Sequence, residues 1–288
     1  MNGIAFHCTL PDKRFDDAWE AIKLPDQVRK RLIAHAILLL TVRQKLPFES
    51  APLHGLIVLS GPPGTGKTTL ARGLASRVAL ALPNKKIQFL QVDPHILASS
   101  ALGRSQQEVT KLFRQTIPEA AMNGPCIVLL DEVETLAVDR HKLSMETNPI
   151  DVHRASDAVL TGLDLLTLEH NGILIVATTN FSKAVDKALL SRADLIEKFD
   201  LPDAVVRREI IADTLKALAT KWPNISKLEA DVETFVKASK GLDGRRLRKT
   251  IVMASAGSIA TAQDPNKLTA QQIIEALHSA TKPDGVAA

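Results

Sequence analysis

A glycine-rich stretch directly after an apolar run constrains this chain more than any other feature. The run is Leu56 to Leu59, and the sequence after Ser60 reads GPPGTGKT over residues 61–68. Glycines in such a loop allow backbone N–H groups to surround phosphate oxygens, and the positive end of a following helix favours the same negative charge. The order of strand, loop and helix start therefore predicts a nucleoside-triphosphate site.

Two side chains of this loop suit the chemistry of a bound nucleotide. Lys67 is long enough to reach the β- and γ-phosphates, and the Thr68 hydroxyl suits Mg²⁺. The alternative is a glycine-bearing turn that binds no nucleotide and matches the pattern by chance. The flanking strand and helix make this alternative less favoured. The residues expected to contact the nucleotide are Gly61, Pro62, Pro63, Gly64, Thr65, Gly66, Lys67, Thr68 and Thr69.

A second apolar run ends in two carboxylates. Residues 126–130 read CIVLL, and Asp131 and Glu132 follow. Desolvating a carboxylate at the end of a buried strand is costly unless it meets a cation. Beside a phosphate loop that cation is Mg²⁺, so Asp131 is predicted to bind the metal with Thr68, directly or through water. Glu132 is predicted to act as the general base for the attacking water. A solvated acidic turn is the alternative interpretation.

A third apolar run, Ile173 to Thr178, is followed by Thr179 and Asn180. A neutral amide at this point can hold the attacking water or a γ-phosphate oxygen without adding charge. Asparagine after a strand is on its own an ordinary turn residue. Its place after the phosphate loop and the acidic strand makes Asn180 a candidate catalytic residue.

The apolar runs alternate with helical patterns, which predicts the fold class. Strands are expected at 56–60, 87–92, 126–131 and 173–178, each nearly continuous in apolar residues, and such strands form a parallel sheet covered on both faces. Residues 1–24 are expected to be irregular. Helices are expected at about 25–44, 67–81, 105–122 and 151–166.

The pattern changes after Pro202. From there to residue 279 the sequence shows helical patterns and no convincing strand, with helices expected at 204–219, 231–239, 245–260 and 269–280. We therefore expect an α/β nucleotide-binding domain over residues 1–202, whose first 50 residues form an N-terminal segment and helix. A small all-helical domain is expected over residues 203–288.

Composition narrows the class of protein and its partners. The chain of 288 residues is 45% hydrophobic and 24% charged, as in ordinary globular proteins. Its net charge is +4, but basic residues are interleaved with acidic ones, so nucleic acid is not indicated as a partner. The longest apolar stretch, 32–42, is too short to span a membrane, and no signal peptide is expected. The two cysteines form no CxxC pair, which favours a reducing, cytoplasmic location.

The motifs together resemble those of the AAA+ ATPases. The set comprises GPPGTGKT, LLDE at 129–132, TTN at 178–180, SRAD at 191–194 and Gly244–Arg245. The resemblance implies a P-loop fold with a parallel sheet flanked by helices and a small helical lid domain, and ATP with Mg²⁺ as cofactors. It implies that Arg192 acts in the neighbouring subunit's site, within a hexameric ring, and that Arg245 touches the nucleotide in its own subunit. Arg246 is an alternative to Arg245, and a solvated basic face is another.

Within AAA+, segments 131–137, 148–154, 158–164 and 241–249, with SRAD, resemble the pachytene-checkpoint ATPases. The compact bacterial members encoded with CBASS antiphage systems are the most similar kind, because only about 50 residues precede the phosphate-loop strand, too few for the adaptor domain of eukaryotic members. The resemblance implies a HORMA-domain protein as substrate, bound to a cyclic-nucleotide synthase, which the ATPase partly unfolds or disassembles.

The resemblance also places loops that grip the substrate. The first pore loop corresponds to residues 98–104, including Ala101, Leu102 and Gly103, and Leu102 is its one sizeable side chain where such motors offer an aromatic. A second loop corresponds to 138–150. Two other functions remain open: a DNA-associated ATPase such as a clamp-loader or initiator-type subunit, and an inactive nucleotide-binding scaffold. The intact candidate residues argue against the scaffold.

Overall fold

A computed structural model describes residues 3–93, 104–122, 124–135, 149–181 and 184–281 of the chain. The chain divides into two compact units. One comprises residues 1–61 and 67–199, and the other comprises residues 62–66 and 200–288.

The first unit is built on a six-stranded sheet whose strand order is β1-β3-β4-β5-β2-β6. The neighbouring strands pair in parallel except β1 and β3, which are antiparallel. The four predicted strands are confirmed, but the sheet is mixed, and two strands at its edges were not predicted. The strands are β1 (Ile4–Leu10), β2 (Leu56–Ser60), β3 (Ile87–Val92), β4 (Cys126–Leu130), β5 (Ile173–Thr179) and β6 (Leu195–Lys198).

The expectation that residues 1–24 are irregular is wrong. β1 forms an edge strand in which half-buried and exposed side chains alternate, and helix α1 (Lys13–Ala21) follows it. The Asp12 side chain caps α1 by accepting a hydrogen bond of 2.9 Å from the Arg14 backbone N–H. Alternation of Ile4, Phe6 and Cys8 with smaller or polar residues is the pattern of a strand with one buried face.

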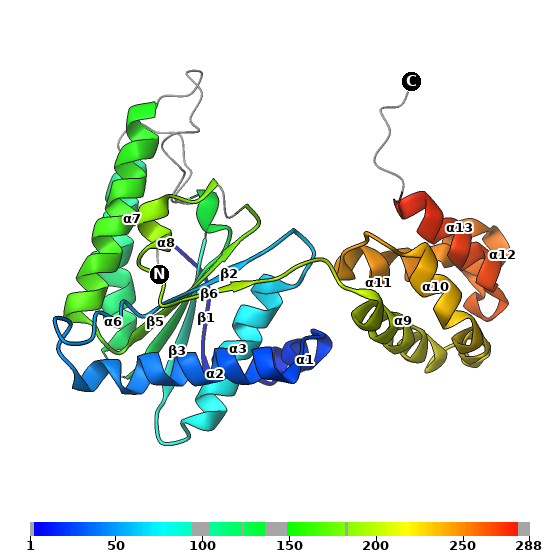
Figure 1. Cartoon of the computed structure of the whole chain (residues 1–288), viewed down its shortest axis with the longest axis horizontal. Helices are drawn as coiled ribbons and strands as arrows, with labels where there is room; N and C mark the ends of the chain where they lie inside the picture. The colour runs from blue at the N-terminus through cyan, green and yellow to red at the C-terminus, as the bar shows by residue number, and fades with distance from the viewer. Residues whose placement is uncertain (1–2, 94–103, 123, 136–148, 182–183, 282–288) are drawn as a thin grey trace. The chain divides into compact units, whose positions relative to one another are not determined.

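Helices cover both faces of the sheet (Figure 1). One face packs on α1, α2 (Asp26–Thr41) and α3 (Lys67–Ala81), and the other on α5 (Arg104–Lys111), α6 (Ile117–Ala121) and α7 (Pro149–Glu169). Side chains alternate along β2, so Ile57 and Leu59 enter the core with α1–α3 while Leu56 and Val58 enter the core with α5–α7. Shorter elements are the 3₁₀ turns Arg43–Lys45 and Val133–Thr135, the π turn Leu112–Thr116 and α8 (Lys187–Leu190).

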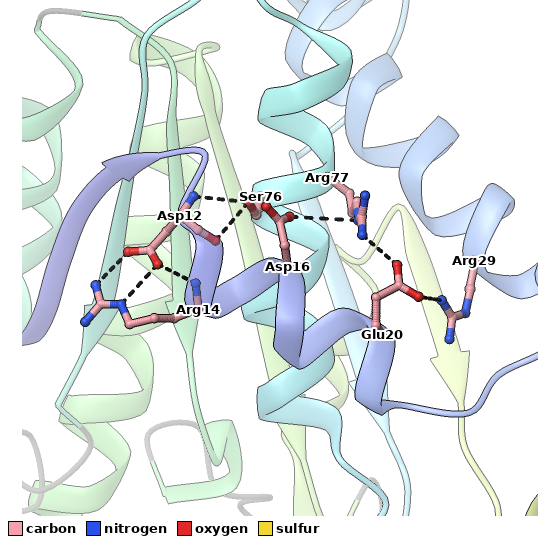
Figure 2. A network of polar contacts seen from close by, with 7 residues as sticks. All are labelled: Asp12, Arg14, Asp16, Glu20, Arg29, Ser76 and Arg77. Atoms are coloured by element: carbon pink, nitrogen blue, oxygen red, sulfur yellow. Dashed lines mark hydrogen bonds and ion pairs between the residues drawn. The ribbon is translucent and has the colours of Figure 1, made fainter. Parts of the chain in front are cut away.

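Polar contacts tie the N-terminal segment to α3 (Figure 2). The Asp12 backbone N–H donates to Ser76 Oγ over 3.2 Å. Glu20 lies between two arginines, at 2.6 Å from Arg77 and 3.7 Å from Arg29. Since α3 begins at Lys67, these contacts link α1 to the helix that carries the end of the phosphate loop.

The second unit has its own apolar core of residues such as Ile211, Phe235, Ile251 and Leu277. No strand occurs over residues 200–281, and α9 (Ala204–Ala219) has the predicted bounds. Asp243 caps α11 by accepting a hydrogen bond from the Arg246 backbone N–H. The other elements are α10 (Val232–Ala238), α11 (Gly244–Met253), α12 (Ile259–Gln263), α13 (Ala270–Thr281) and the 3₁₀ turns Pro223–Asp231, Ala254–Gly257 and Pro265–Lys267.

Over the ranges that the structure describes, no helix has both the length and the apolar character that crossing a membrane requires.

A buried arginine holds the amino edge of the sheet. Arg43, 4% exposed, donates hydrogen bonds to the backbone carbonyls of His54, His170, Asn171 and Ile173. Burial lowers the pKa of the Arg43 guanidinium to about 10, partly offset by the charge of Asp194, so the side chain stays protonated at neutral pH. The guanidinium therefore joins the end of α2 to the segments that precede β2 and β5.

We predict that Arg43→Met destabilises the protein by about 2–4 kcal/mol, because methionine keeps the length of the side chain but leaves several buried carbonyls without donors. Calorimetry should show a lower melting temperature. Arg14→Met is the matched control, since Arg14 is 70% exposed and pairs with Asp12 at the surface, where ion pairs contribute little. Equal melting temperatures for the two variants would contradict the structural role of Arg43.

Candidate nucleotide site

The phosphate loop begins where β2 ends between two parallel neighbours. The Gly61 backbone N–H donates to Thr179 O of β5 over 3.2 Å. A Cβ atom at Gly61 would lie 2.2 Å from Phe199 O, which follows β6, so a side chain cannot fit here. Gly64 and Gly66 have φ values of +79° and +89°, a region that favours glycine. Three of the predicted glycines are therefore required by the backbone itself.

Lys67 begins α3 and is only 6% exposed. Its ammonium donates to Gly61 O over 2.7 Å and to Asn180 Oδ1 over 2.9 Å. A buried ammonium needs such acceptors because leaving water is costly. The structure thus brings together the lysine of the loop and the asparagine that follows β5, which lie 113 residues apart in the chain.

Asp131 follows the end of β4, and one of its carboxylate oxygens accepts hydrogen bonds from two hydroxyl groups. Thr68 Oγ1 is 2.8 Å and Thr178 Oγ1 is 2.5 Å from Asp131 Oδ1. Two adjacent ligands of an octahedral Mg²⁺ at 2.0–2.1 Å lie about 2.9 Å apart, so Thr68 and Asp131 have the spacing of such a pair. Within the described ranges no group of three or more His, Cys, Asp or Glu side chains is arranged to hold a metal ion.

Glu132 has a left-handed backbone conformation, with φ at +51°, which is uncommon outside glycine. Its N–H donates to Thr178 Oγ1 over 3.1 Å, and its carbonyl accepts the Thr135 N–H and hydroxyl at 2.9 and 2.8 Å. Strain of this kind persists only where surrounding contacts enforce it. Glu132 is exposed, so its carboxylate is accessible to a substrate water.

Asn180 connects these groups. Its Nδ2 lies 3.4 Å from Glu132 Oε1, while its Oδ1 faces Lys67. Its backbone N–H donates to Glu134 Oε1 over 3.0 Å. Sequence reasoning missed Thr178 and Glu134. Their places in the sequence could have indicated both, because Thr178 is the first residue of the TTN motif and Glu134 lies two residues after Glu132.

Arg192 is not brought to this site within one chain. It precedes β6, in which Leu195 pairs with Ile57 and Lys198 pairs with Ser60. The parallel register places Arg192 at the amino edge of the sheet, while the phosphate loop leaves from the carboxyl edge, on the order of 10 Å or more away. Arg192 instead pairs with Asp164 of α7, with N–O distances of 2.7 and 2.8 Å.

The remaining candidates belong largely to the second unit. Arg245 is exposed on α11, and its backbone N–H donates to Gly64 O over 3.3 Å. The Arg246 side chain donates to Ala280 O over 2.8 Å. Pro62, Pro63 and Thr65 also belong to this unit, and Thr69 lies on α3. The pore-loop residues Ala101, Leu102 and Gly103, and residues 138–148 of the second loop, lie outside the described residues.

Comparisons with known proteins agree with this geometry. The model of the ATPase family associated with various cellular activities (AAA) matches residues 57–201. CD-NTase-associated protein 6 of Pseudomonas aeruginosa is 48% identical over 280 residues, which cover 96% of this chain and 92% of that protein. Putative pachytene checkpoint protein 2 of Caenorhabditis elegans is 33% identical over 215 residues, which cover 73% of this chain and 50% of that protein.

Solved structures show the same fold. A chain of the E. coli MS115-1 HORMA:CdnC:Trip13 complex superimposes with a TM-score of 0.77 at 20% identity, covering 96% of this chain and 95% of its own. PCH-2 of C. elegans gives a TM-score of 0.76 at 24% identity, covering 95% of this chain and 74% of its own. The chain belongs to the AAA+ ATPases, in the group that contains the pachytene checkpoint proteins and CD-NTase-associated protein 6.

Proposed function

We propose that this protein couples ATP hydrolysis to the remodelling of HORMA-domain protein complexes, and so regulates a bacterial cyclic-oligonucleotide antiphage pathway in the cytoplasm. One observation carries the proposal. The side chains that we propose for hydrolysis occur together in a chain that is 48% identical, over nearly its whole length, to a CD-NTase-associated protein. A scaffold that only bound a nucleotide would use Lys67 but would have no need of the strained backbone at Glu132, the proposed general base.

The candidate side chains around β2, β4 and β5 divide the proposed work of hydrolysis among them. Lys67 and the loop N–H groups bind the β- and γ-phosphates. Thr68 and Asp131 would hold Mg²⁺, which would neutralise charge on the phosphates when it is bound. Glu132 orients the attacking water and accepts its proton, and Asn180 fixes the Glu132 carboxylate relative to Lys67.

The position of Arg192 supports action between subunits. Because it lies at the opposite edge of the sheet from its own Lys67, its guanidinium is available to a neighbouring nucleotide and not to its own. A contact in which one face supplies the arginine and a different face supplies the phosphate site is heterologous. Such contacts form a ring when the rotation between neighbouring subunits closes. We propose that the ring is a homo-hexamer, as the resemblance to the AAA+ ATPases implies, in which Arg192 stabilises the transition state in trans and Arg245 contacts the nucleotide in cis.

The proposed substrate is a HORMA-domain protein bound to a cyclic-nucleotide synthase. Support comes from the family to which the chain belongs and from the relative named for its association with such a synthase. In this proposal the loop containing Ala101, Leu102 and Gly103 pulls on the polypeptide, with Leu102 as the side chain that grips it.

Glu132→Gln should retain ATP binding and lower kcat by about 10²–10⁴-fold, because the amide cannot accept the proton of the attacking water. Steady-state hydrolysis and nucleotide affinity measure the two effects. Glu119→Gln on α6 is the matched control, since it removes the charge of an exposed glutamate outside the site. Hydrolysis at the normal rate by Glu132→Gln would exclude this general base.

Arg192→Ala and Lys67→Ala should each abolish most hydrolysis, the arginine substitution by roughly 10³-fold. A mixture of the two variants should regain activity, because a Lys67→Ala subunit still offers Arg192 to an intact site next to it. The Lys67→Ala/Arg192→Ala double variant serves as the control, since it brings no arginine to the mixture. Failure of the first mixture to exceed the control would contradict action in trans.

A HORMA-domain protein should raise the rate of hydrolysis, and DNA should leave it unchanged. The measurement with DNA is needed because a protein with a net charge of +4 can bind DNA nonspecifically. Two salt concentrations are needed because nonspecific binding of DNA falls steeply with salt. Measuring the ATPase rate with each partner at low and physiological salt separates the two. Stimulation by DNA that persists at physiological salt, with none by the HORMA protein, would favour a DNA-associated ATPase.

A further inference from the structure

Arg192 already has a carboxylate partner in its own chain. Its Nε donates to Asp164 Oδ1 over 2.7 Å and its Nη2 donates to Asp164 Oδ2 over 2.8 Å, which makes the pair bidentate. Its Nη1 donates to Ala188 O over 2.7 Å. The three bonds fix the plane of the guanidinium as well as its position.

The backbone of Arg192 is fixed from both sides. Its N–H donates to Leu189 O at the end of α8, a helix capped by Asp186. Two residues later, the Asp194 carboxylate accepts the backbone N–H groups of His54 and Leu56 at 3.0 and 2.8 Å. With the backbone fixed, the rotamers of the arginine side chain are the freedom that the bonds to Asp164 and Ala188 restrict.

The position of Asp164 is also fixed, by the packing of the helix that carries it. It lies on α7 next to Leu163, which with Leu166 is buried in the core against the sheet. Two residues earlier, α7 packs closely on the π turn, since a Cβ atom at Gly162 would lie 2.4 Å from Phe113 Cγ. The carboxylate therefore projects from a helix that cannot shift easily.

The pair leaves part of the guanidinium open. Arginine has five N–H donors, and the bonds to Asp164 and Ala188 use three. The other two, one on each Nη, have no partner among the residues that the structure describes. The Arg192 side chain is 23% exposed and that of Asp164 44%, so an acceptor outside the chain can reach these donors.

The two charges also stabilise each other. Hydrogen bonding to Arg192 lowers the pKa of the Asp164 carboxyl, and hydrogen bonding to Asp164 raises the pKa of the Arg192 guanidinium. Both groups are therefore charged at neutral pH, and the pair persists under assay conditions.

We propose that Asp164 is a positioning residue for Arg192. It holds the Nε side of the guanidinium so that the two open N–H donors face the γ-phosphate of the neighbouring subunit. A preset guanidinium loses little conformational freedom when the transition state forms, which is where positioning accelerates a reaction. The inference rests on the trans role of Arg192 that we propose above.

Asp164→Asn tests it directly, because asparagine keeps the shape of the side chain but loses the charge and one acceptor. We expect kcat to fall by about 10–100-fold with the KM for ATP nearly unchanged, as for a displaced catalytic group. Combined with Arg192→Ala it should cause no further loss. Mixed with Lys67→Ala subunits, which carry an intact Asp164–Arg192 pair, Asp164→Asn should regain activity, whereas a folding defect would not be repaired by a neighbour.

Glu233→Gln is the matched control. Glu233 pairs with Arg208 in the second unit through the same two guanidinium nitrogens, and its loss should change neither kcat nor KM. If Asp164→Asn lowers the melting temperature, Asp164→Glu keeps the charge and should show a smaller fall in kcat than Asp164→Ala.

An unchanged or increased kcat for Asp164→Asn would overturn the inference, an increase indicating that Asp164 restrains Arg192 instead. Additional loss in the Arg192→Ala background would also overturn it. Normal hydrolysis by Arg192→Ala itself would instead refute the proposed trans role. Loss with Arg192→Ala but not with Asp164→Asn would refute the positioning role alone.

Discussion

The parallel pairing of β2 with both β5 and β6 is the constraint on which the rest of the structure depends. Parallel strands end at the same edge, so β2 delivers Gly61 beside Thr179 and Asn180. The same pairing fixes the opposite edge, where Arg192 lies three residues before the start of β6. One sheet thus separates Arg192 from the phosphate loop of its own chain, and under the function that we propose this separation makes assembly part of the chemistry.

Polar groups at the carboxyl edge are held by one another. Lys67, Asn180 and Glu132 form one chain of hydrogen bonds, and Thr68, Asp131 and Thr178 form a second. The buried Lys67 and Thr178 need such partners because an unpaired buried polar group is costly. Under the proposed function, the contacts that satisfy these groups also position the side chains that bind the nucleotide.

Local sequence patterns predicted the covered strands, because residues buried on both faces must be apolar throughout. Edge strands have a less continuous run of apolar residues, since part of their surface is exposed to water. β1 was missed for this reason, although Phe6 and Cys8 alternate with polar residues, and β6 was missed because LIEK is short and half charged. The antiparallel direction of β1 is not encoded in its seven residues and follows from its pairing with β3.

The sequence by itself determined the phosphate loop, the acidic strand end, Asn180 and the family, because backbone conformation and ligand chemistry restrict these positions to few residue types. The tertiary structure decided the partners of these groups: Thr178 on Asp131, Glu134 on Asn180, and Asp164 on Arg192. Many polar residues are able to fill such supporting positions, and contacts between residues tens of positions apart in the chain leave no local pattern. Which carboxylate meets which guanidinium is set by the packing of α7 against the sheet.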